Sequence, residues 1–340
     1  MFRDIGLANV RVDKVGNVLG ERRGSQSKPH LVFSAHLDTV FPEGTPVTVK
    51  RDGNILRGPG IGDDCRGLAV LLAVARTIVK GNVPTPGSIT FVGTVGEEGL
   101  GDLRGVKYLF REGMKGQIDR FVSIDGTGLG ITHIAVGSLR YRVTFKGPGG
   151  HSYGAFGMVN PIQALGRAMA KIADFEVPRE PKTTFNVGRI GGGTSVNAIP
   201  YEAWAEVDMR SADPSALKFL DTKFRKAIDD AVAEENKRWG SKQLTVDVSL
   251  VGDRAAGRTT ADAPVVVAAV SATKALGLPV TLDEGSTDSN VAMNMGIPAI
   301  TIDGGGRGTG AHALDEAFDP TNSWQGTQRA LLICLALAQQ

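Results

Sequence analysis

The chain has 340 residues, of which 41% are hydrophobic and 22% charged, and its formal net charge at pH 7 is +2. This composition is that of an ordinary globular protein, and the length allows roughly two domains. The small net charge gives no global argument for a nucleic acid or an anionic membrane as a partner, and no apolar stretch reaches the roughly 20 residues that span a bilayer.

The outer parts of the chain alternate apolar runs, ended by Gly, Asp or His, with helical patterns. This alternation is typical of an α/β fold. The runs that we predict as buried strands are 31–35, 88–95, 121–124 and 298–302. The predicted helices are 67–79, which is apolar enough to be buried, and 321–339, which closes the chain.

The middle of the chain has a different pattern, in which apolar and polar residues alternate along the strands. Predicted strands are 132–146, 183–190, 201–210 and 244–250, and predicted helices are 161–173 and 214–239. The order β-α-β-β-α-β is that of a ferredoxin-like domain. We therefore predict an inserted domain at 138–250, between the two parts of a first domain, 1–137 and 251–340.

Ligand-type side chains follow the buried strands of the first domain. They are His36 and Asp38 after the first strand, Glu97 and Glu98 after the second, Asp125 after the third, and His312 after the fourth, with Asp63 and Asp64 just before the first helix. The carboxyl ends of strands in an open α/β sheet share one edge, where ligands bind. We therefore expect these side chains to gather there.

Two histidines and several carboxylates suit a hard or borderline divalent cation such as zinc, manganese or cobalt. Without a cation, packed carboxylates would repel each other and their pKa values would rise. Cations about 3.5–4 Å apart are a known device for amide hydrolysis. Adjacent residues in an extended chain point in opposite directions, so one of Glu97 and Glu98 can bind metal while the other acts as a general base.

Each motif by itself has a simpler interpretation. His36 and Asp38 could merely end a strand, although their spacing also lets Asp38 orient the His36 ring. Glu97 and Glu98 could lie in a solvated loop, and Asp63 with Asp64 could cap a helix. Their joint position at matching strand ends favours a metal site.

Eight segments together resemble the motifs of one family. They are SAHLDTV (34–40), RGPGIGDDCRGLA (57–69), GTVGEEG (93–99), SIDGTG (123–128), KGPGGHS (146–152), GGTSVNAIP (192–200), DMRS (208–211) and GTGAHALDE (308–316). In this order they resemble the M20 family of metallopeptidases and deacylases, and its peptidase T-like and carboxypeptidase G2-like members in particular. The resemblance implies a metal-dependent exopeptidase-like catalytic domain, a mixed sheet flanked by helices, with an inserted ferredoxin-like lid and dimerisation domain.

The resemblance also implies roles in the first domain. Asp63 would bridge two metal ions, zinc in the first place and manganese or cobalt as alternatives. Glu98 and His312 would complete one metal site, and His36 and Asp125 the other. Glu97 would be the general base that acts on a water between the metals, and Asp38 would support His36. The Asp63–Asp64 peptide bond is expected to be cis.

In the inserted domain, the resemblance implies that His151 stabilises the oxyanion in the active site of a partner subunit. Asn197 and Arg210 would hold the substrate, for which the bidentate geometry of Arg is suited to a carboxylate. His151 could instead be a turn residue and Arg210 a surface charge. The family resemblance favours a homodimer that forms through the lid domain.

The expected function is that of a zinc metallopeptidase, an aminopeptidase acting on di- or tripeptides. The alternatives are an N-acyl amino acid deacylase of the same family and, less favoured, a non-catalytic binding protein on this fold. A nucleotide-binding enzyme is rejected, because the Gly-rich stretch 304–310 lacks the context of a dinucleotide fingerprint.

Two features bear on where the protein acts. Cys65 and Cys334 lie far apart without a partner motif, which favours a reducing compartment, and residues 1–20 do not resemble a signal peptide. Both predict a cytoplasmic protein. His36 follows only 35 residues, fewer than is usual in the family. The resemblance therefore implies either a truncated start, which would hide any upstream signal, or the loss of the family's first helix.

Overall fold

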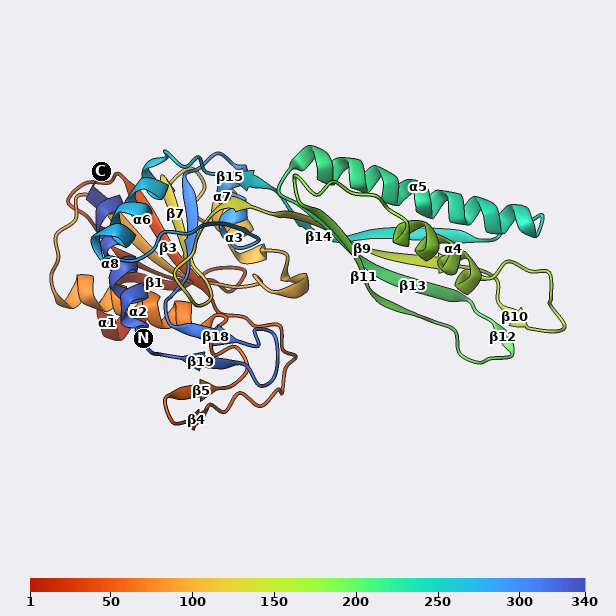
Figure 1. The fold of residues 1–340 in the computed structure, drawn as a ribbon, viewed down its shortest axis with the longest axis horizontal. Coiled ribbons are helices and arrows are strands. Elements are labelled where there is room, and N and C mark those ends of the chain that lie inside the picture. The colour runs from red at the N-terminus through yellow and green to blue at the C-terminus, as the bar shows by residue number, and fades with distance from the viewer. Residues whose placement is uncertain (340) are drawn as a thin grey trace. The chain divides into compact units, whose positions relative to one another are not determined.

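The computed structural model describes residues 1–339. The chain forms two compact units, Met1–Ala135 with Gly257–Gln340, and Val136–Ala256 (Figure 1). No helix within residues 1–339 combines the length and the apolar character needed to cross a bilayer.

Four parallel strands form the centre of the sheet in the first unit. They are β6 (Ser88–Thr94), β3 (His30–His36), β7 (Arg120–Ile124) and β17 (Ala299–Ile302), in this spatial order. Strands that are covered on both faces have nearly continuous apolar sequences, which is why these four could be predicted. Their carboxyl ends lie along one edge of the sheet.

Strands of the opposite direction make the sheet mixed. On one side β2 (Val18–Arg22) pairs antiparallel with β6 and is followed by β1 (Ala8–Val12). On the other side β8 (Ile131–Ala135) pairs antiparallel with β17, and β15 (Gly257–Arg258) and β16 (Leu282–Gly285) pair with β8.

Helices cover both faces of this sheet. One face packs against α1 (Phe2–Ile5), α2 (Cys65–Lys80), α6 (Pro264–Ala275) and α8 (Trp324–Gln339). The other packs against α3 (Arg104–Tyr108), a π-helical turn η2 (Leu109–Gly113) and α7 (Ser289–Asn294). Alternate residues of β3 contribute to the two cores, because successive side chains of a strand point to opposite faces: Phe33 packs on the side of α2, and Val32 on the side of α3.

A second, small sheet of the first unit joins distant parts of the chain. Its order is β18 (Arg307–Thr309), β19 (Ala317–Asp319), β5 (Ile55–Arg57) and β4 (Lys50–Asp52). A short 3₁₀ turn, η1 (Gly99–Gly101), follows β6 elsewhere in the unit. Within the small sheet, Ala317 of β19 pairs with Arg57 of β5. The sheet therefore brings the segment before Asp63 beside the segment after His312.

The second unit is a four-stranded antiparallel sheet with two helices. Its elements in chain order are β9 (Gly137–Lys146), α4 (Pro161–Ala173), β11 (Thr183–Gly192), β13 (Glu202–Ser211), α5 (Pro214–Arg238) and β14 (Thr245–Arg254). The spatial order is β11-β13-β9-β14. Leu165, Phe224 and Val143 are buried between the helices and the sheet.

The predicted single strand 132–146 is wrong in one respect. It is divided at Val136 into β8 and β9, which belong to different sheets and different units. Apolar alternation continues across the division, and a change of pairing partner has no signature in that alternation.

Candidate metal-binding active site

The predicted ligands lie at the carboxyl ends of the central strands. His36 is the last residue of β3, Asp125 follows β7 directly, and Glu98 lies in the turn after β6. His312 lies between β18 and β19 and has φ 68°, a left-handed conformation that few residues other than glycine adopt. Such strained positions are frequent at functional sites.

Asp63 lies between the two histidines. Its Oδ1 is 2.9 Å from Nε2 of His36, and its Oδ2 is 3.1 Å from Nε2 of His312. Asp125 Oδ1 lies 3.8 Å from His36 Nε2 on the first side. Glu98 Oε1 lies 3.1 Å from His312 Nε2 on the second side. The structure thus brings together all five residues that the family resemblance suggests as ligands, in two groups of contacts that share Asp63.

The electrostatics of this cluster fit divalent cations. Burial by itself would lower the pKa of His36, but the contacts with Asp125 and Asp63 raise that pKa well above its usual value. Burial also raises the pKa of Glu98, and the nearby charge of Asp63 adds to this shift. The raised pKa of His36 favours a positive ring among the carboxylates, and the raised pKa of Glu98 favours a neutral carboxyl group. Both reduce the net negative charge of the cluster, as bound cations would do.

Asp64 has a different environment from its neighbour. Its Oδ1 accepts hydrogen bonds from the backbone N–H groups of Gly67, at 3.0 Å, and Gly126, at 3.3 Å. Its Oδ2 accepts one from the N–H of His36, at 3.1 Å. Asp64 therefore caps α2 and joins three segments of the site. The Asp63–Asp64 peptide bond is cis, as the resemblance implied.

Three atoms meet in each of two groups suited to a cation. They are His36, Asp63 and Glu98, and His36, Asp64 and Asp125, with the ligand atoms of each group within 4.8 Å of one another. Both groups contain His36 and neither contains His312, whose contacts are with Asp63 and Glu98. Asp64 was not among the expected ligands. Three backbone N–H groups already bind the Asp64 carboxylate, which leaves it less capacity for a cation than Asp63 or Asp125.

Asp38 holds the turn that carries Glu97 and Glu98. Its carboxylate accepts hydrogen bonds from the N–H groups of Gly96 (2.8 Å), Glu97 (3.2 Å) and Glu98 (2.9 Å). The His36 ring instead contacts the backbone oxygen of Asp38, 2.9 Å from Nδ1, and the Asp38 carboxylate is 3.9 Å from that nitrogen. The predicted support of the ring therefore comes from the main chain of Asp38. Glu97 is buried in the turn.

His151 and Asn197 are neighbours in the second unit. His151, in β10 (Gly150–His151), pairs with Ala198 of β12 (Ala198–Ile199), and the N–H of Ser152 donates to the backbone oxygen of Asn197 at 2.9 Å. Both side chains are exposed. Nδ1 of His151 accepts hydrogen bonds from the N–H groups of Tyr153 and Gly154, so a neutral ring carries its proton on Nε2.

Arg210 lies at the other end of β13. It pairs with Ser138 in β9, whereas Glu202, at the start of β13, pairs with Lys146. Eight residues of strand span about 26 Å at roughly 3.3 Å per residue. The Arg210 Nε donates to Asp208 at 2.7 Å. Within one unit, the structure therefore does not bring Arg210 together with His151 and Asn197.

Two buried carboxylates near the cluster had no predicted role. Glu316 appeared only as the last residue of a matching segment, and it lies against the loop before Asp63. Asp288, the residue before α7, accepts a hydrogen bond from Thr94 at 2.5 Å. The glycines at positions 58, 60 and 62 could have signalled a closely approached backbone, but no local pattern identifies the carboxylate that approaches it.

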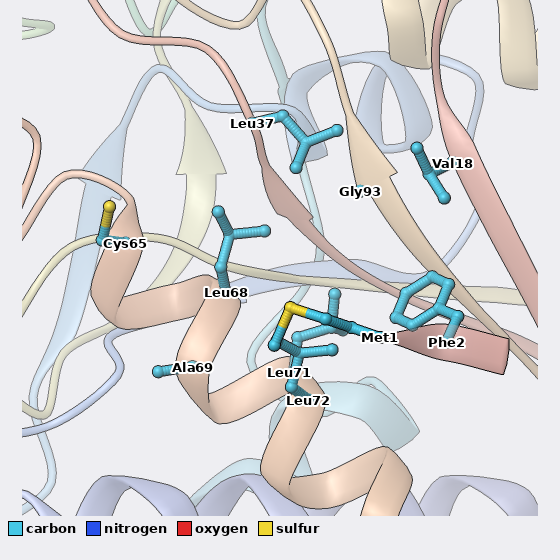
Figure 2. A pocket seen from close by; sticks show the side chains of 10 residues that line it. All are labelled: Met1, Phe2, Val18, Leu37, Cys65, Leu68, Ala69, Leu71, Leu72 and Gly93. Atoms are coloured by element: carbon cyan, nitrogen blue, oxygen red, sulfur yellow. The ribbon is translucent and has the colours of Figure 1, made fainter. Parts of the chain in front are cut away.

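A cavity of about 390 Å³ lies beside α2 and is almost entirely apolar. Figure 2 shows Leu68 and Leu72 on α2 opposite Leu37, with Cys65 at the start of the helix. The full lining is Met1, Phe2, Val18, Leu37, Cys65, Leu68, Ala69, Leu71, Leu72 and Gly93. None of the five clustered ligands is among these residues, so the cavity and the cluster are distinct features.

Related sequences support a common origin. Peptidase family M20/M25/M40 matches residues 32–335. The uncharacterized protein YqjE of Bacillus subtilis is 28% identical over 321 residues, which are 88% of this chain and 81% of that protein. The succinyl-diaminopimelate desuccinylase of Leptothrix cholodnii is 27% identical over 254 residues, 69% of this chain and 65% of that enzyme.

Solved structures share the fold at lower identity. A tripeptidase from Staphylococcus aureus has a TM-score of 0.79 at 23% identity, over 100% of this chain and 91% of that one. A dinuclear metal-binding M20 peptidase of Bacillus subtilis has a TM-score of 0.69 at 17% identity, over 100% and 90%. The expected exopeptidase-like α/β fold is thereby confirmed. With the family match over residues 32–335, the chain belongs to peptidase family M20/M25/M40 and is a hydrolase of that family.

Proposed function

We propose that this chain is a two-metal hydrolase that cleaves the peptide bond of small peptides, with di- and tripeptides as the first substrates to test. The position of Asp63 supports this most strongly, since its two oxygens face two different histidines. A carboxylate so placed can serve two neighbouring cations. The proposed ligands are His36, Asp63, Asp125, Glu98 and His312.

Two divalent cations in this cluster would polarise the scissile carbonyl and lower the pKa of a water. Zinc is the preferred choice, because imidazole and carboxylate are its usual ligands in hydrolases. Manganese and cobalt are the alternatives for the same residue types. The histidine and carboxylate ligands support all three cations, and their relative affinities are a matter for measurement.

Glu97 is the proposed general base. It follows the strand β6 in the same turn as Glu98, and Asp38 fixes the backbone N–H groups of both. A carboxylate oxygen of Glu97 accepts a proton from the attacking water and then gives that proton to the departing amine. The proton is thus returned, and Glu97 is ready for another cycle.

His151 is the proposed donor to the oxyanion. Its Nδ1 already accepts two backbone hydrogen bonds, so a neutral ring carries its proton on Nε2. Because the residue is exposed, that N–H can be offered to a developing negative charge. Asn197, next to it, and Arg210 are the proposed substrate-binding residues. Arg210 would hold a substrate carboxylate by a charge-assisted hydrogen bond.

We further propose that the working form is a homodimer. Arg210 lies near the end of β13, whereas His151 in β10 pairs with Ala198, just before the start of that strand. From Glu202 to Arg210 the strand spans about 26 Å at roughly 3.3 Å per residue. A dipeptide is far shorter than this distance. If both residues contact one small substrate, they must come from two copies of the chain, and a closed two-fold pair is the commonest way to arrange this.

The second candidate is an N-acyl amino acid deacylase. The match to a desuccinylase, 27% identical over 69% of this chain, favours it, while the tripeptidase structure favours the peptidase. Both reactions hydrolyse an amide, so the metal cluster serves either one. The side chains that contact the groups on each side of that amide decide between them.

A substrate screen tests the proposal. Purified protein is treated with chelator, supplied with zinc, manganese or cobalt, and assayed on dipeptides, tripeptides and N-acyl amino acids. We expect hydrolysis of small peptides that chelator abolishes and added metal restores. Faster hydrolysis of N-acyl amino acids would select the deacylase, and metal-independent hydrolysis would contradict the two-metal mechanism.

A further inference from the structure

Glu316 is a buried carboxylate that binds the backbone before Asp63. Its side chain is 2% exposed. Oε1 accepts hydrogen bonds from the N–H groups of Gly62, at 2.8 Å, and Asp63, at 3.0 Å. Oε2 accepts one from the N–H of Gly60, at 2.9 Å. Three backbone donors thus surround one carboxylate, in a loop more than 250 residues earlier in the chain.

The loop is shaped around this side chain. Gly60 has φ 73°, in the left-handed region, and a Cβ at Gly62 would lie 2.8 Å from Oε1 of Glu316. Only glycine at position 62 therefore allows the carboxylate to approach without a shift. The backbone oxygen of Glu316 also accepts a hydrogen bond from the N–H of Gly58, at 2.9 Å.

Glu316 connects the two segments that meet in one half of the metal cluster. It follows His312 by four residues on the same segment, and its carboxylate binds the N–H of Asp63 itself. The 3.1 Å contact between Asp63 Oδ2 and His312 Nε2 therefore spans two segments that Glu316 joins. A loop rich in glycine has much conformational freedom to lose, and these hydrogen bonds restrict it.

On the His36 side of the cluster, a different carboxylate joins the segments. There Asp64 binds the N–H groups of His36 and Gly126, and so joins the end of β3 to the turn after β7. None of these hydrogen bonds involves Glu316. Disturbing Glu316 should consequently act on the His312 side more than on the His36 side.

We propose that Glu316 is a positioning residue, which fixes Asp63 against His312 and thereby sets the affinity for a cation on the His312 and Glu98 side. This inference rests on the proposed function, in which the cluster binds two cations. Residues that orient metal ligands typically change metal affinity by roughly 10- to 100-fold when they are replaced. The effect should be asymmetric between the two cations.

The test is calorimetric titration of chelator-treated protein with zinc or manganese, without substrate. Glu316→Gln keeps the shape but directs an amide donor at a backbone N–H. We expect one of two binding steps to weaken by roughly 10- to 100-fold and the other to stay unchanged. Asp315→Asn is the matched control: it removes one charge from the adjacent, exposed residue, and should leave both steps unchanged.

A second pair of variants assigns the weakened step. In a His312→Ala background, which leaves the His36 side, adding Glu316→Gln should cause no further loss of affinity. Gly62→Ala places a methyl group against Oε1 of Glu316 and so displaces the same carboxylate by a change in the loop. It should reproduce the asymmetric loss of affinity, so the inference remains testable if Glu316→Gln does not fold. Circular dichroism of each variant confirms that it is folded.

The outcomes distinguish a failure of the proposed two-metal function from a failure of the proposed role of Glu316. If the unaltered protein takes up no divalent cation, the proposed function fails and the inference fails with it. If the unaltered protein binds two cations, and Glu316→Gln and Gly62→Ala bind both as tightly, only the inference fails. Equal weakening of both steps would mean that Glu316 acts on the fold as a whole, and would also contradict it.

Discussion

Asp63 and Glu97 differ in what each contributes to the site. Asp63 contacts both histidines, so its removal leaves both halves of the cluster one ligand short. Glu97 is buried in the adjacent turn and is proposed to move a proton rather than to bind metal. Variants at the two positions should therefore separate metal binding from turnover.

We expect Glu97→Ala to keep its metal and to lose turnover by roughly 10²- to 10⁴-fold, the usual contribution of a general base. Asp63→Ala should lose metal and turnover together. Metal content by mass spectrometry and steady-state kinetics on the same preparations check this. Normal turnover in Glu97→Ala would remove Glu97 from its proposed role.

Asp288 predicts a pH dependence of stability. Burial raises its pKa from 3.8 to about 6, and its Oδ1 has no hydrogen-bond partner among residues 1–339. Between these two pH values the folded chain keeps a proton that the unfolded chain releases. Stability should therefore fall as pH rises from about 4 to about 6, and stay lower above that range.

Asp288→Asn should remove this loss in metal-free protein. At one pKa unit per about 1.4 kcal/mol, the variant should be more stable than the unaltered chain by about 3 kcal/mol at pH 7.5, and equal to it near pH 4. Urea unfolding in the presence of chelator, at both pH values, measures the difference. A variant that is equally destabilised at both would contradict the assignment.

At the scale of elements, the turn after β6 depends on Asp38 from the segment after β3. Three backbone N–H groups of this turn donate to one carboxylate. Asp38→Asn replaces one acceptor atom by a donor, so we expect turnover to fall by roughly 10- to 100-fold and the free energy of unfolding to fall by about 1–3 kcal/mol.

Kinetics and urea unfolding measure these two effects of Asp38→Asn. Asp52→Asn, an exposed change in β4, is the control and should alter neither quantity. Full turnover in a folded Asp38→Asn protein would show that the turn keeps its shape without the Asp38 carboxylate.

Elements with a strong apolar pattern could be predicted from the sequence, and others could not. β3, β6, β7 and β17 are buried on both faces, and α4 was predicted with its observed bounds, Pro161–Ala173. The three-residue strands β4, β5, β18 and β19 are too short to show a period. The helix α6, rich in Val and Ala, has no clear apolar stripe and was not predicted.

The residues of the candidate site also divide into those that a sequence pattern could predict and those that it could not. The place of His36 and Asp125, two proposed ligands, could be predicted because they lie at the ends of apolar strands, whose carboxyl ends share an edge. The roles of Glu316 and Asp288 depend on contacts with residues far away in the chain, Gly62 and Thr94. No local pattern encodes such contacts. For Asp38, the sequence suggested a side-chain contact with the ring, and the carboxylate binds the neighbouring turn instead.

At the scale of the whole molecule, the proposed dimer makes a distinct prediction. If His151 acts in the partner's site, a mixed dimer of His151→Ala and Glu97→Ala chains contains one site with neither change. Mixing the two inactive proteins under conditions that exchange subunits should restore about a quarter of full activity, the statistical share for two-fold pairs.

Each variant mixed with itself is the control and should remain inactive. Size-exclusion chromatography with light scattering reports whether the chain is dimeric in the same buffer. A monomer with full activity, or a mixture that regains no activity although subunits exchange, would contradict the shared site.

Diffraction from crystals grown with zinc tests the central claim most directly, with data collected on both sides of the zinc absorption edge. The account predicts two anomalous peaks, one on each side of the Asp63 carboxylate, the first beside His36 and Asp125 and the second beside Glu98 and His312. Peaks only elsewhere on the molecule, or none in crystals that contain zinc, would contradict it.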